Sequence, residues 1–382
     1  MSGDEAEARD AVEKAEREPL LGHRIAPVRA AIDAAAAILD RVAVPALRAR
    51  LLLRLATVKM VESDFEGADQ ALEAVGRHVP DDVVLRFLCG IRACRVAIRR
   101  GPAPREVAQQ TLLNVAERLD AFDTGAPGWD VVSTEVALAI AELGLHDDPP
   151  DATAIEPLAD LVAALLPGAE VELAFVGNQL VAAFALSLGE VDRAVRALRP
   201  VVTLARDAGS PADEVEARIA LASSLVAGGD PIGLEEATRH VQIARDRALE
   251  HGLVELHQAA LLAQAGVLSQ AGKTAGAIDR VLELARTAVA NHDVAQYVAA
   301  VGVMAELYAR SGDHVSAFRT IVESHRALAD ATQTDTTTLF RPLLARLQDR
   351  VGEDRLGKIA ADVDTANRLA DQITQQKSKD PS

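Results

Sequence analysis

Apolar residues recur along most of this chain at the spacing of an α-helix, whereas the strict alternation that marks a β-strand is nearly absent. Pro27 and Pro45 each stand where an apolar-periodic segment begins, as prolines in a first helical turn do. In the first part of the chain, the pattern predicts helices over residues 4–18, 27–42, 45–62, 65–79, 82–100, 103–122, 129–143 and 152–166. From residue 170 it predicts helices in pairs, over 170–188 with 190–208, 212–228 with 233–250, 253–271 with 274–291 and 294–311 with 314–331, followed by 335–350 and 355–376. We therefore expect an all-α fold.

A repeated spacing of alanines joins these helices into hairpins. Two alanines twelve residues apart flank the predicted turn in four places, at Ala56/Ala68, Ala182/Ala194, Ala265/Ala277 and Ala305/Ala317. A glycine follows the first alanine by seven residues in the last three pairs, and a fifth copy, Ala222 to Ala237, has Gly229 at that place and three extra residues after it. Small residues let two helices approach closely, and glycine accepts the positive φ of a tight turn. The first alanines recur every 40 to 43 residues from Ala182 to Ala305, a period typical of a helical-hairpin solenoid.

This pattern resembles the tetratricopeptide repeat family, in its longer variety of about 40 residues. Leu268 and Tyr308 stand where the family carries a large residue at the eleventh repeat position, and Pro80 stands where it carries a proline near the thirty-second. Residues 175–331 match as four repeats and residues 49–82 as one, while 83–170 are assigned two further hairpins from periodicity alone. The resemblance implies a right-handed superhelical solenoid of antiparallel helical hairpins.

Four regions follow from this assignment. We expect a charged N-terminal helix or extension over residues 1–22, the repeat array over 23–331, C-terminal capping helices over 332–376 and a disordered tail over 377–382.

The resemblance also implies a concave groove lined by the first helix of each repeat. Carried over to this chain, its positions include seven candidate partner-binding residues, which are Gln179, Leu186, Glu216, Ser223, Leu262, Ser269 and Glu306. A small apolar groove with isolated polar groups would accept a helix or an extended peptide. The alternative is that some of these residues pack against the next repeat or a terminal helix, which suits the polar members least because buried polar groups need partners. The lining lacks the lysine and asparagine clamp with which chaperone-binding members of the family hold a C-terminal carboxylate.

Charge is distributed unevenly along the chain. The net charge of −17 argues against binding to a nucleic-acid backbone. Residues 119–192 contain fourteen acidic side chains and no lysine or arginine, whereas Arg92, Arg95 and Arg99 place three like charges on one helix face just before them. Two interpretations are open: the acidic hairpin neutralises the arginines within the chain, or this basic face docks an acidic partner.

The sequence offers few groups for chemistry. Motifs of metalloproteases, serine hydrolases and nucleotide-binding proteins are absent and the nine histidines are dispersed, so we expect no enzyme, no metal and no cofactor. His146, in the acidic loop 145–151, fits a solvated turn better than a cation site. Cys89 and Cys94 cannot pair with each other on one helix and are interpreted as core residues. The chain lacks both an apolar run of roughly 20 residues and a signal core, which predicts a cytoplasmic protein outside the membrane.

The last predicted helix carries a short apolar stripe at 4-3-4-3 spacing, formed by Ile359, Val363, Ala366, Ala370 and Ile373. We interpret it as a cap on the last repeat, and a homodimer through this helix is the alternative. Together with the groove, these patterns predict a non-enzymatic scaffold that binds another protein or a peptide segment. A ligand- or peptide-sensing regulator, similar to peptide-responsive bacterial repeat regulators, is the alternative function.

Overall fold

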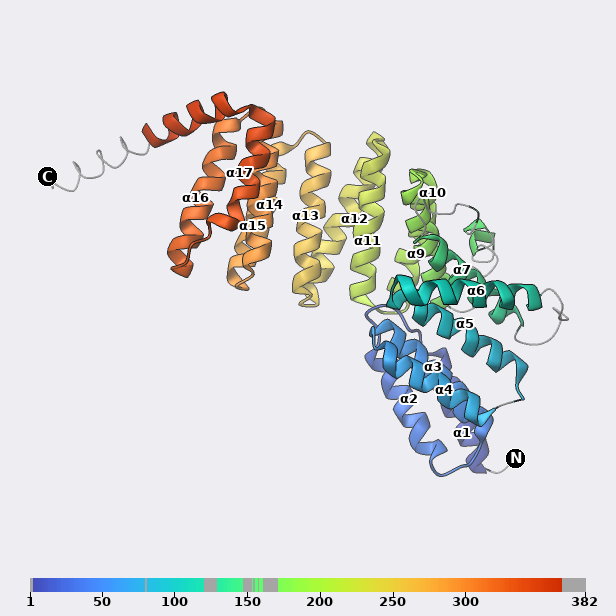
Figure 1. The fold of residues 1–382 in the computed structure, drawn as a ribbon. Coiled ribbons are helices and arrows are strands. Elements are labelled where there is room, and N and C mark those ends of the chain that lie inside the picture. Colours follow the sequence, from blue (N-terminus) through green and yellow to red (C-terminus); the bar gives the residue numbers. More distant parts are fainter. Residues whose placement is uncertain are drawn as a thin grey trace. The chain divides into compact units, whose positions relative to one another are not determined.

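The computed structural model describes residues 3–79, 81–119, 129–146 and 171–365, and between them residues 153, 155, 156 and 158–160. Within these residues the regular secondary structure is helical and no strand occurs (Figure 1). The all-α fold predicted from the apolar spacing is therefore confirmed. The chain divides into two compact units, Met1–Gly228 (unit 1) and Gly229–Ser382 (unit 2).

The helix bounds follow the sequence pattern closely. Unit 1 contains α1 (Gly3–Arg17), α2 (Ala26–Leu39), α3 (Pro45–Val61), α4 (Phe65–His78), α5 (Val83–Arg100), α6 (Pro102–Leu119), α7 (Trp129–Gly144), α9 (Val171–Ser187), α10 (Val191–Asp207) and α11 (Pro211–Gly228). Unit 2 contains α12 (Pro231–Glu250), α13 (Val254–Gln270), α14 (Thr274–Ala290), α15 (Val294–Arg310), α16 (His314–Thr332) and α17 (Thr337–Val351), and residues 353–365 are also helical. The predicted helix over 152–166 lies largely outside the described residues. In the part of the chain that the structure describes, no helix is both long and apolar enough to cross a membrane.

Consecutive helices pack side by side as hairpins in each unit. In unit 1, α3 packs against α4, α5 packs against α6, and α10 packs against both α9 and α11. In unit 2, each helix from α12 to α16 packs against the next, and α17 packs against α16 and α15 (Figure 1). Each unit therefore contains predicted helical hairpins, whereas the predicted pair 212–228 with 233–250 falls on the two sides of the division between the units.

Eight of the alanines of the repeated spacing lie in hairpins within one unit, formed by α3 with α4, α9 with α10, α13 with α14 and α15 with α16, whereas Ala222 and Ala237 lie on α11 and α12, one in each unit. All ten are buried, with exposed fractions between 0% and 6%. The glycine seven residues after the first alanine has a positive φ at each of its four positions, for example 75° at Gly189 and 84° at Gly312. In the earliest copy the same place is taken by Ser63, which adopts a φ of 60° without being glycine. The alanine spacing therefore reports both the close helix contact and the left-handed turn that precedes the second helix.

Aspartates fix the start of several helices. The residues Asp64, Asp82, Asp230, Asp293 and Asp313 each accept a hydrogen bond from the backbone N–H three positions later, at 2.9 to 3.1 Å. These side chains satisfy an N–H group that has no partner within the helix, and this is why aspartate is favoured as an N-cap. The turn residue and the aspartate together set where the next helix begins.

Replacing a buried alanine by leucine tests the repeat contacts. Ala277→Leu is expected to lower the free energy of unfolding by about 1–3 kcal/mol, because the larger side chain overfills a packed interior. Ala277 is fully buried where α14 packs between α13 and α15. Ala275→Leu, at an exposed position of the same helix, is the matched control and should change stability by about 0.5 kcal/mol at most. Equal urea midpoints for the two variants would show that Ala277 is not at a close helix contact.

The N-terminal helix belongs to the interior of unit 1. Although its sequence is highly charged, α1 buries Ala8, Val12 and Ala15 completely and packs against α2 and α3. The division between the units falls at Gly228 and Gly229, in the one repeat copy that carries three extra residues after its glycine. The irregular repeat copy therefore coincides with the division between the two units.

The C-terminal stripe is only partly described. Ile359 and Val363 are buried, with exposed fractions of 7% and 3%, whereas Ala366, Ala370 and Ile373 lie outside the described residues. Side chains that are already covered within one chain are poorly placed to form a dimer seam. The two described members of the stripe therefore agree with a cap, and the homodimer stays a prediction.

Candidate functional site

The predicted groove residues of unit 1 lie at the surface of α9 and α11. Gln179, Leu186 and Ser223 are exposed, and Leu186 leaves 44% of its surface accessible. Glu216 is also exposed, but one of its carboxylate oxygens lies 2.9 Å from Nε2 of His23. Glu216 therefore already has a partner within the chain, which the groove prediction did not anticipate.

The predicted groove residues of unit 2 come together around one cavity. Leu262 and Ser269 on α13 and Glu306 on α15 line a cavity of about 690 Å³. The third wall is formed by α17, through Leu343 and Leu347. We call this cavity the α13–α17 groove. Its volume falls within the roughly 300–1,000 Å³ typical of sites that bind a ligand or a few side chains.

Small residues give the α13–α17 groove its depth. A Cβ atom added to Gly266 would meet nothing within 4 Å, so this glycine faces open space. A Cβ atom added to Gly302 would lie 2.9 Å from Cδ2 of Leu343, so this glycine lets α17 approach α15. Leu262 leaves 41% of its surface accessible at the groove. The result is an apolar floor that an incoming side chain could contact.

The rim of the α13–α17 groove is charged. Oε1 of Glu306 accepts a hydrogen bond from Nε of Arg310 at 2.8 Å. The same oxygen forms an ion pair with Nη2 of Arg350, also at 2.8 Å. Arg346, one helical turn before Arg350, also lines the groove and is exposed. Glu306 is therefore neither a free groove carboxylate nor buried without a partner. It holds α17 to α15 across the groove.

The contribution of α17 was missed by the sequence prediction. The repeat positions identify residues of α13 and α15, but they contain no rule for a helix that follows the array. A signal did exist, because Leu343 and Leu347 are four residues apart and so are Arg346 and Arg350. That spacing places a mixed apolar and basic face on one side of α17.

The predicted basic face on α5 is not an exposed surface. Arg95 is only 5% exposed, and its guanidinium donates to Oε2 of Glu135 at 2.9 Å and to both oxygens of Glu142 at 2.9 and 3.1 Å. Both carboxylates belong to α7, in the acidic stretch that follows the arginines, and both are buried. A partner protein cannot reach Arg95 without opening the contact between α5 and α7.

The other two arginines are held by the same carboxylates. Arg92 donates to Oε1 of Glu135 at 2.8 Å and to Oγ1 of Thr57 at 2.7 Å, and Arg99 donates to Oε1 of Glu142 at 2.6 Å. The charge pattern left two interpretations open, and the structure agrees with the first of them: the arginines of α5 pair with carboxylates of the same chain. This pairing, together with the burial of Arg95 and the partial burial of Arg92, argues against a docking face at these two positions. Arg99 keeps 34% of its side chain exposed but is paired.

A second cavity, of about 730 Å³, lies in unit 1 between the end of α1 and helices α3, α5, α7 and α9. Its lining is rich in charges that pair with one another. Nε of Arg50 donates to Glu16 at 2.8 Å, and Nη1 of Arg54 donates to Glu172 at 2.5 Å. Because these charges are already matched, the cavity offers a ligand less free electrostatic attraction than the α13–α17 groove.

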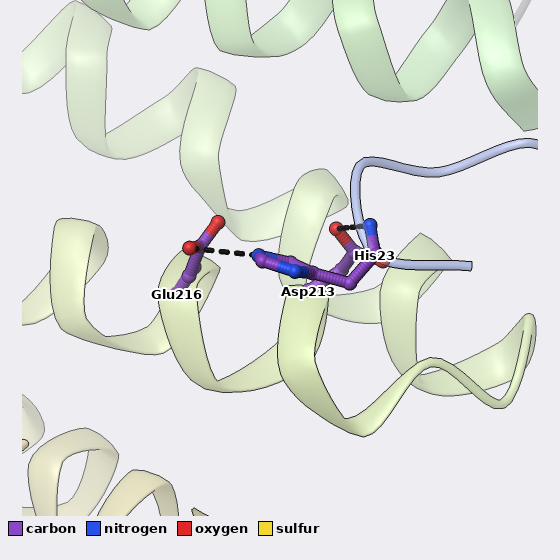
Figure 2. A group of neighbouring side chains, drawn as sticks. All are labelled: His23, Asp213 and Glu216. Atoms are coloured by element: carbon purple, nitrogen blue, oxygen red, sulfur yellow. Dashed lines mark hydrogen bonds and ion pairs between the residues drawn. The ribbon is translucent and has the colours of Figure 1, made fainter. Parts of the chain in front are cut away.

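The linker between α1 and α2 is attached to α11 by a cluster of polar groups (Figure 2). The backbone N–H of His23 donates to the two carboxylate oxygens of Asp213 at 3.1 and 3.2 Å, and the imidazole faces Glu216. Oγ of Ser210 also donates to Asp213. A Cβ atom added to Gly22 would lie 3.0 Å from Oδ1 of Asp213, so a glycine here permits the close approach.

His23, Asp213 and Glu216 also present three possible metal-ligand atoms within 4.8 Å of one another. Burial raises the pKa of Asp213, although hydrogen bonds from Ser210 and His23 oppose this effect. Both carboxylates also face hydrogen-bonding groups of the linker, since Asp213 accepts from the backbone N–H of His23 and Glu216 lies against its imidazole. The cluster ties together residues 190 apart in the chain, and no local sequence pattern could have indicated it.

Both cysteines are free and behave as interior residues. Cys94 is buried and Cys89 is partly buried, and neither forms a disulfide. Burial raises the pKa of each thiol to about 11. A thiol with so high a pKa carries almost no thiolate near neutral pH, and the thiolate is the reactive form. The interpretation of these cysteines as core residues is therefore confirmed.

Comparisons with known proteins bear on the fold. The chain matches no protein-family model, and no curated protein is significantly similar to it. Among solved structures, it is similar to a signal transduction ATPase with numerous domains (STAND) protein with a tetratricopeptide repeat sensor, from Pyrococcus horikoshii. The TM-score is 0.51 and the identity 13%, over 91% of this chain and 54% of that chain. The fold is a tetratricopeptide-like helical repeat.

The chain is also similar to a Rap protein complexed with competence and sporulation factor. The TM-score is 0.48 and the identity 13%, over 86% of this chain and 93% of that chain. This chain spans about half the length of the STAND protein, and its low identity to both structures limits the likeness to the fold. The handedness of the superhelix along the whole chain stays a prediction.

Proposed function

We propose that this protein is a non-enzymatic, cytoplasmic interaction module that binds a segment of a partner protein in the α13–α17 groove. The observation that carries the proposal is the convergence of Leu262, Ser269 and Glu306 on one open cavity. Repeat positions alone predict these residues, and the cavity combines an apolar floor with a few polar groups, as peptide grooves do. The mechanism is steric and electrostatic: a preformed surface orders the bound segment without chemistry.

A substitution that fills the groove with a larger side chain tests this proposal. Gly266→Leu is expected to abolish or strongly weaken the binding of peptides that a random-peptide display library yields on the full chain. A loss of about tenfold or more, which corresponds to 1.4 kcal/mol, is expected because the leucine would fill the space that the glycine leaves open. The substitution should not destabilise the fold, because glycine is disfavoured inside a helix by roughly 0.5–1 kcal/mol relative to alanine. Binding would be measured by fluorescence anisotropy and stability by urea unfolding.

Gly76→Leu is the matched control for that experiment. Gly76 is also an exposed helical glycine, in α4 of unit 1, and a Cβ atom added there would meet nothing within 4 Å. This variant should bind the selected peptides like the parent protein. If Gly266→Leu bound them equally well, the α13–α17 groove would not be their site.

A peptide-sensing regulator is the second candidate function. The observation that favours it is the position of α17, which forms one wall of the groove while it packs against both α15 and α16. A peptide in the groove would contact α17 directly and would therefore bias its position. Amide hydrogen exchange with and without a selected peptide separates the two functions. A scaffold should show protection at the groove alone, whereas a sensor should also change exchange along α16 and the helix over residues 353–365.

A further inference from the structure

The α13–α17 groove carries an excess of positive charge. Arg310, Arg346 and Arg350 line it, and Glu306 is its one acidic lining residue among the described residues. Glu306 is shared by Arg310 and Arg350. One carboxylate cannot neutralise three guanidinium groups, so the rim has a local balance of +2 in a chain whose net charge is −17.

Arg346 is the arginine of the rim that is available to a partner. It is exposed, and no carboxylate of the described residues lies within ion-pair distance of it. Arg346 and Arg350 are four residues apart on α17, and like charges at this spacing repel each other on one helix face. Glu306 relieves the repulsion only through Arg350. An added carboxylate at this place would relieve the remainder.

We propose that the segment bound in this groove is acidic, with a carboxylate placed next to an apolar side chain. The apolar side chain would lie on the floor formed by Leu262 and Gly266, and the carboxylate would pair with Arg346. Guanidinium groups bind carboxylates through two parallel hydrogen bonds, which gives such a contact direction as well as charge. This inference rests on the proposed function, because it specifies the chemistry of the partner at the same site. It also assigns α17, which lies after the repeats, to the binding surface.

The geometry favours a peptide over the other common anionic partner, a nucleic acid. The arginines surround an apolar floor, whereas a phosphate backbone is bound by extended basic surfaces. The overall charge of −17 would also repel a polyanion at long range but would repel a short acidic segment much less.

The test uses the peptides selected on the full chain. We expect them to be enriched in aspartate and glutamate beside apolar residues. Each peptide would be labelled with fluorescein and resynthesised with glutamine or lysine in place of its acidic residues. The parent protein should bind the acidic form about fivefold or more tightly than the glutamine form, and added salt should reduce the difference. Arg346→Glu should weaken binding of the acidic form by a similar factor. This variant should also bind the lysine form more tightly than the acidic form.

Arg326→Glu provides the matched control. Arg326 is an exposed arginine on α16 of the same unit and does not line the groove, so its replacement changes the net charge equally. It should leave the order of the three peptide forms unchanged. The inference is overturned if the selected peptides show no acidic enrichment, if the three forms bind alike, or if Arg346→Glu and Arg326→Glu act alike. It is also overturned if a single-stranded oligonucleotide competes for Arg346 more strongly than the acidic peptide does. In these cases the proposed function still stands if Gly266→Leu blocks peptide binding, whereas failure to select any peptide removes both.

Discussion

Arg95→Met is expected to lower the free energy of unfolding of unit 1 by about 3–5 kcal/mol, because removing one partner of a buried ion pair leaves the other charge uncompensated. Arg95 is 5% exposed, and Glu135 and Glu142 are 3% and 6% exposed. Without Arg95, Glu142 would keep only the partly exposed Arg99, and Glu135 would keep only Arg92. The contact between α5 and α7 depends on these pairs, so the loss should appear as unfolding of unit 1 in urea.

The measurement can distinguish the two units. Trp129 is the single tryptophan of the chain and begins α7, so its fluorescence should follow unit 1 while circular dichroism follows both units. Arg99→Met is the matched control and should cost about 1 kcal/mol or less, because Arg99 is the most exposed arginine of the network. Adding Glu142→Leu to Arg95→Met should recover part of the loss, since apolar groups often replace a buried ion pair without cost. Equal losses for Arg95→Met and Arg99→Met would contradict this account of the network.

Acid should weaken unit 1 through the same network. Burial alone would raise the pKa of Glu142, but the attraction and hydrogen bonds of Arg95 and Arg99 outweigh it and lower the pKa from 4.5 to about 2. The pKa of Glu135 is also lowered, because Arg92 and Arg95 outweigh the effect of burial there. A carboxyl group whose pKa is lower in the folded state binds its proton more readily in the unfolded chain. Its stabilising contribution is therefore present above pH 4.5 and is lost as the pH falls toward 2.

The size of this effect follows from the shift of Glu142. At 1.36 kcal/mol for each pKa unit, it corresponds to roughly 3 kcal/mol of stability at neutral pH that protonation removes. We expect the urea midpoint reported by Trp129 fluorescence to fall steeply between pH 4.5 and 2. Glu142→Gln should already be destabilised at pH 7 and should show a flatter dependence over that interval. A parent-like slope in Glu142→Gln would assign the acid sensitivity to other carboxylates.

The network also clarifies what the unusual charge pattern means. Three arginines on one face of α5 pair with Glu135 and Glu142 of α7, which are two of the fourteen acidic residues in the stretch that follows. The sequence could identify both sets of charges but could not decide between internal pairing and a docking surface. That decision depends on burial, because solvent screens an exposed pair while a buried pair must be matched.

The local features of this protein could be predicted from its amino acids alone. Helices, turns and hairpins follow from contacts between residues close together in the chain, so the apolar spacing and the Ala-to-Gly interval were sufficient to place them. Leu262, Ser269 and Glu306 were predicted from the resemblance to the repeat family, whose concave-face positions lie on one face of the first helix of each repeat. The positive φ at Ser63 shows that the turn belongs to the repeat itself and does not require glycine.

Contacts between groups far apart in the chain could not be predicted, because they depend on how the helices pack. The approach of α17 to the groove, the pairing of Arg95 with Glu142 and the attachment of His23 to Asp213 each join residues separated by roughly 40 to 190 positions. Helical periodicity does not predict contacts over such separations, because it fixes the face of the helix on which a residue lies but not what that face will contact. Burial and net charge at a site are properties of the assembled surfaces, so the internal role of the α5 arginines and the basic rim of the α13–α17 groove arise only when the helices are packed together.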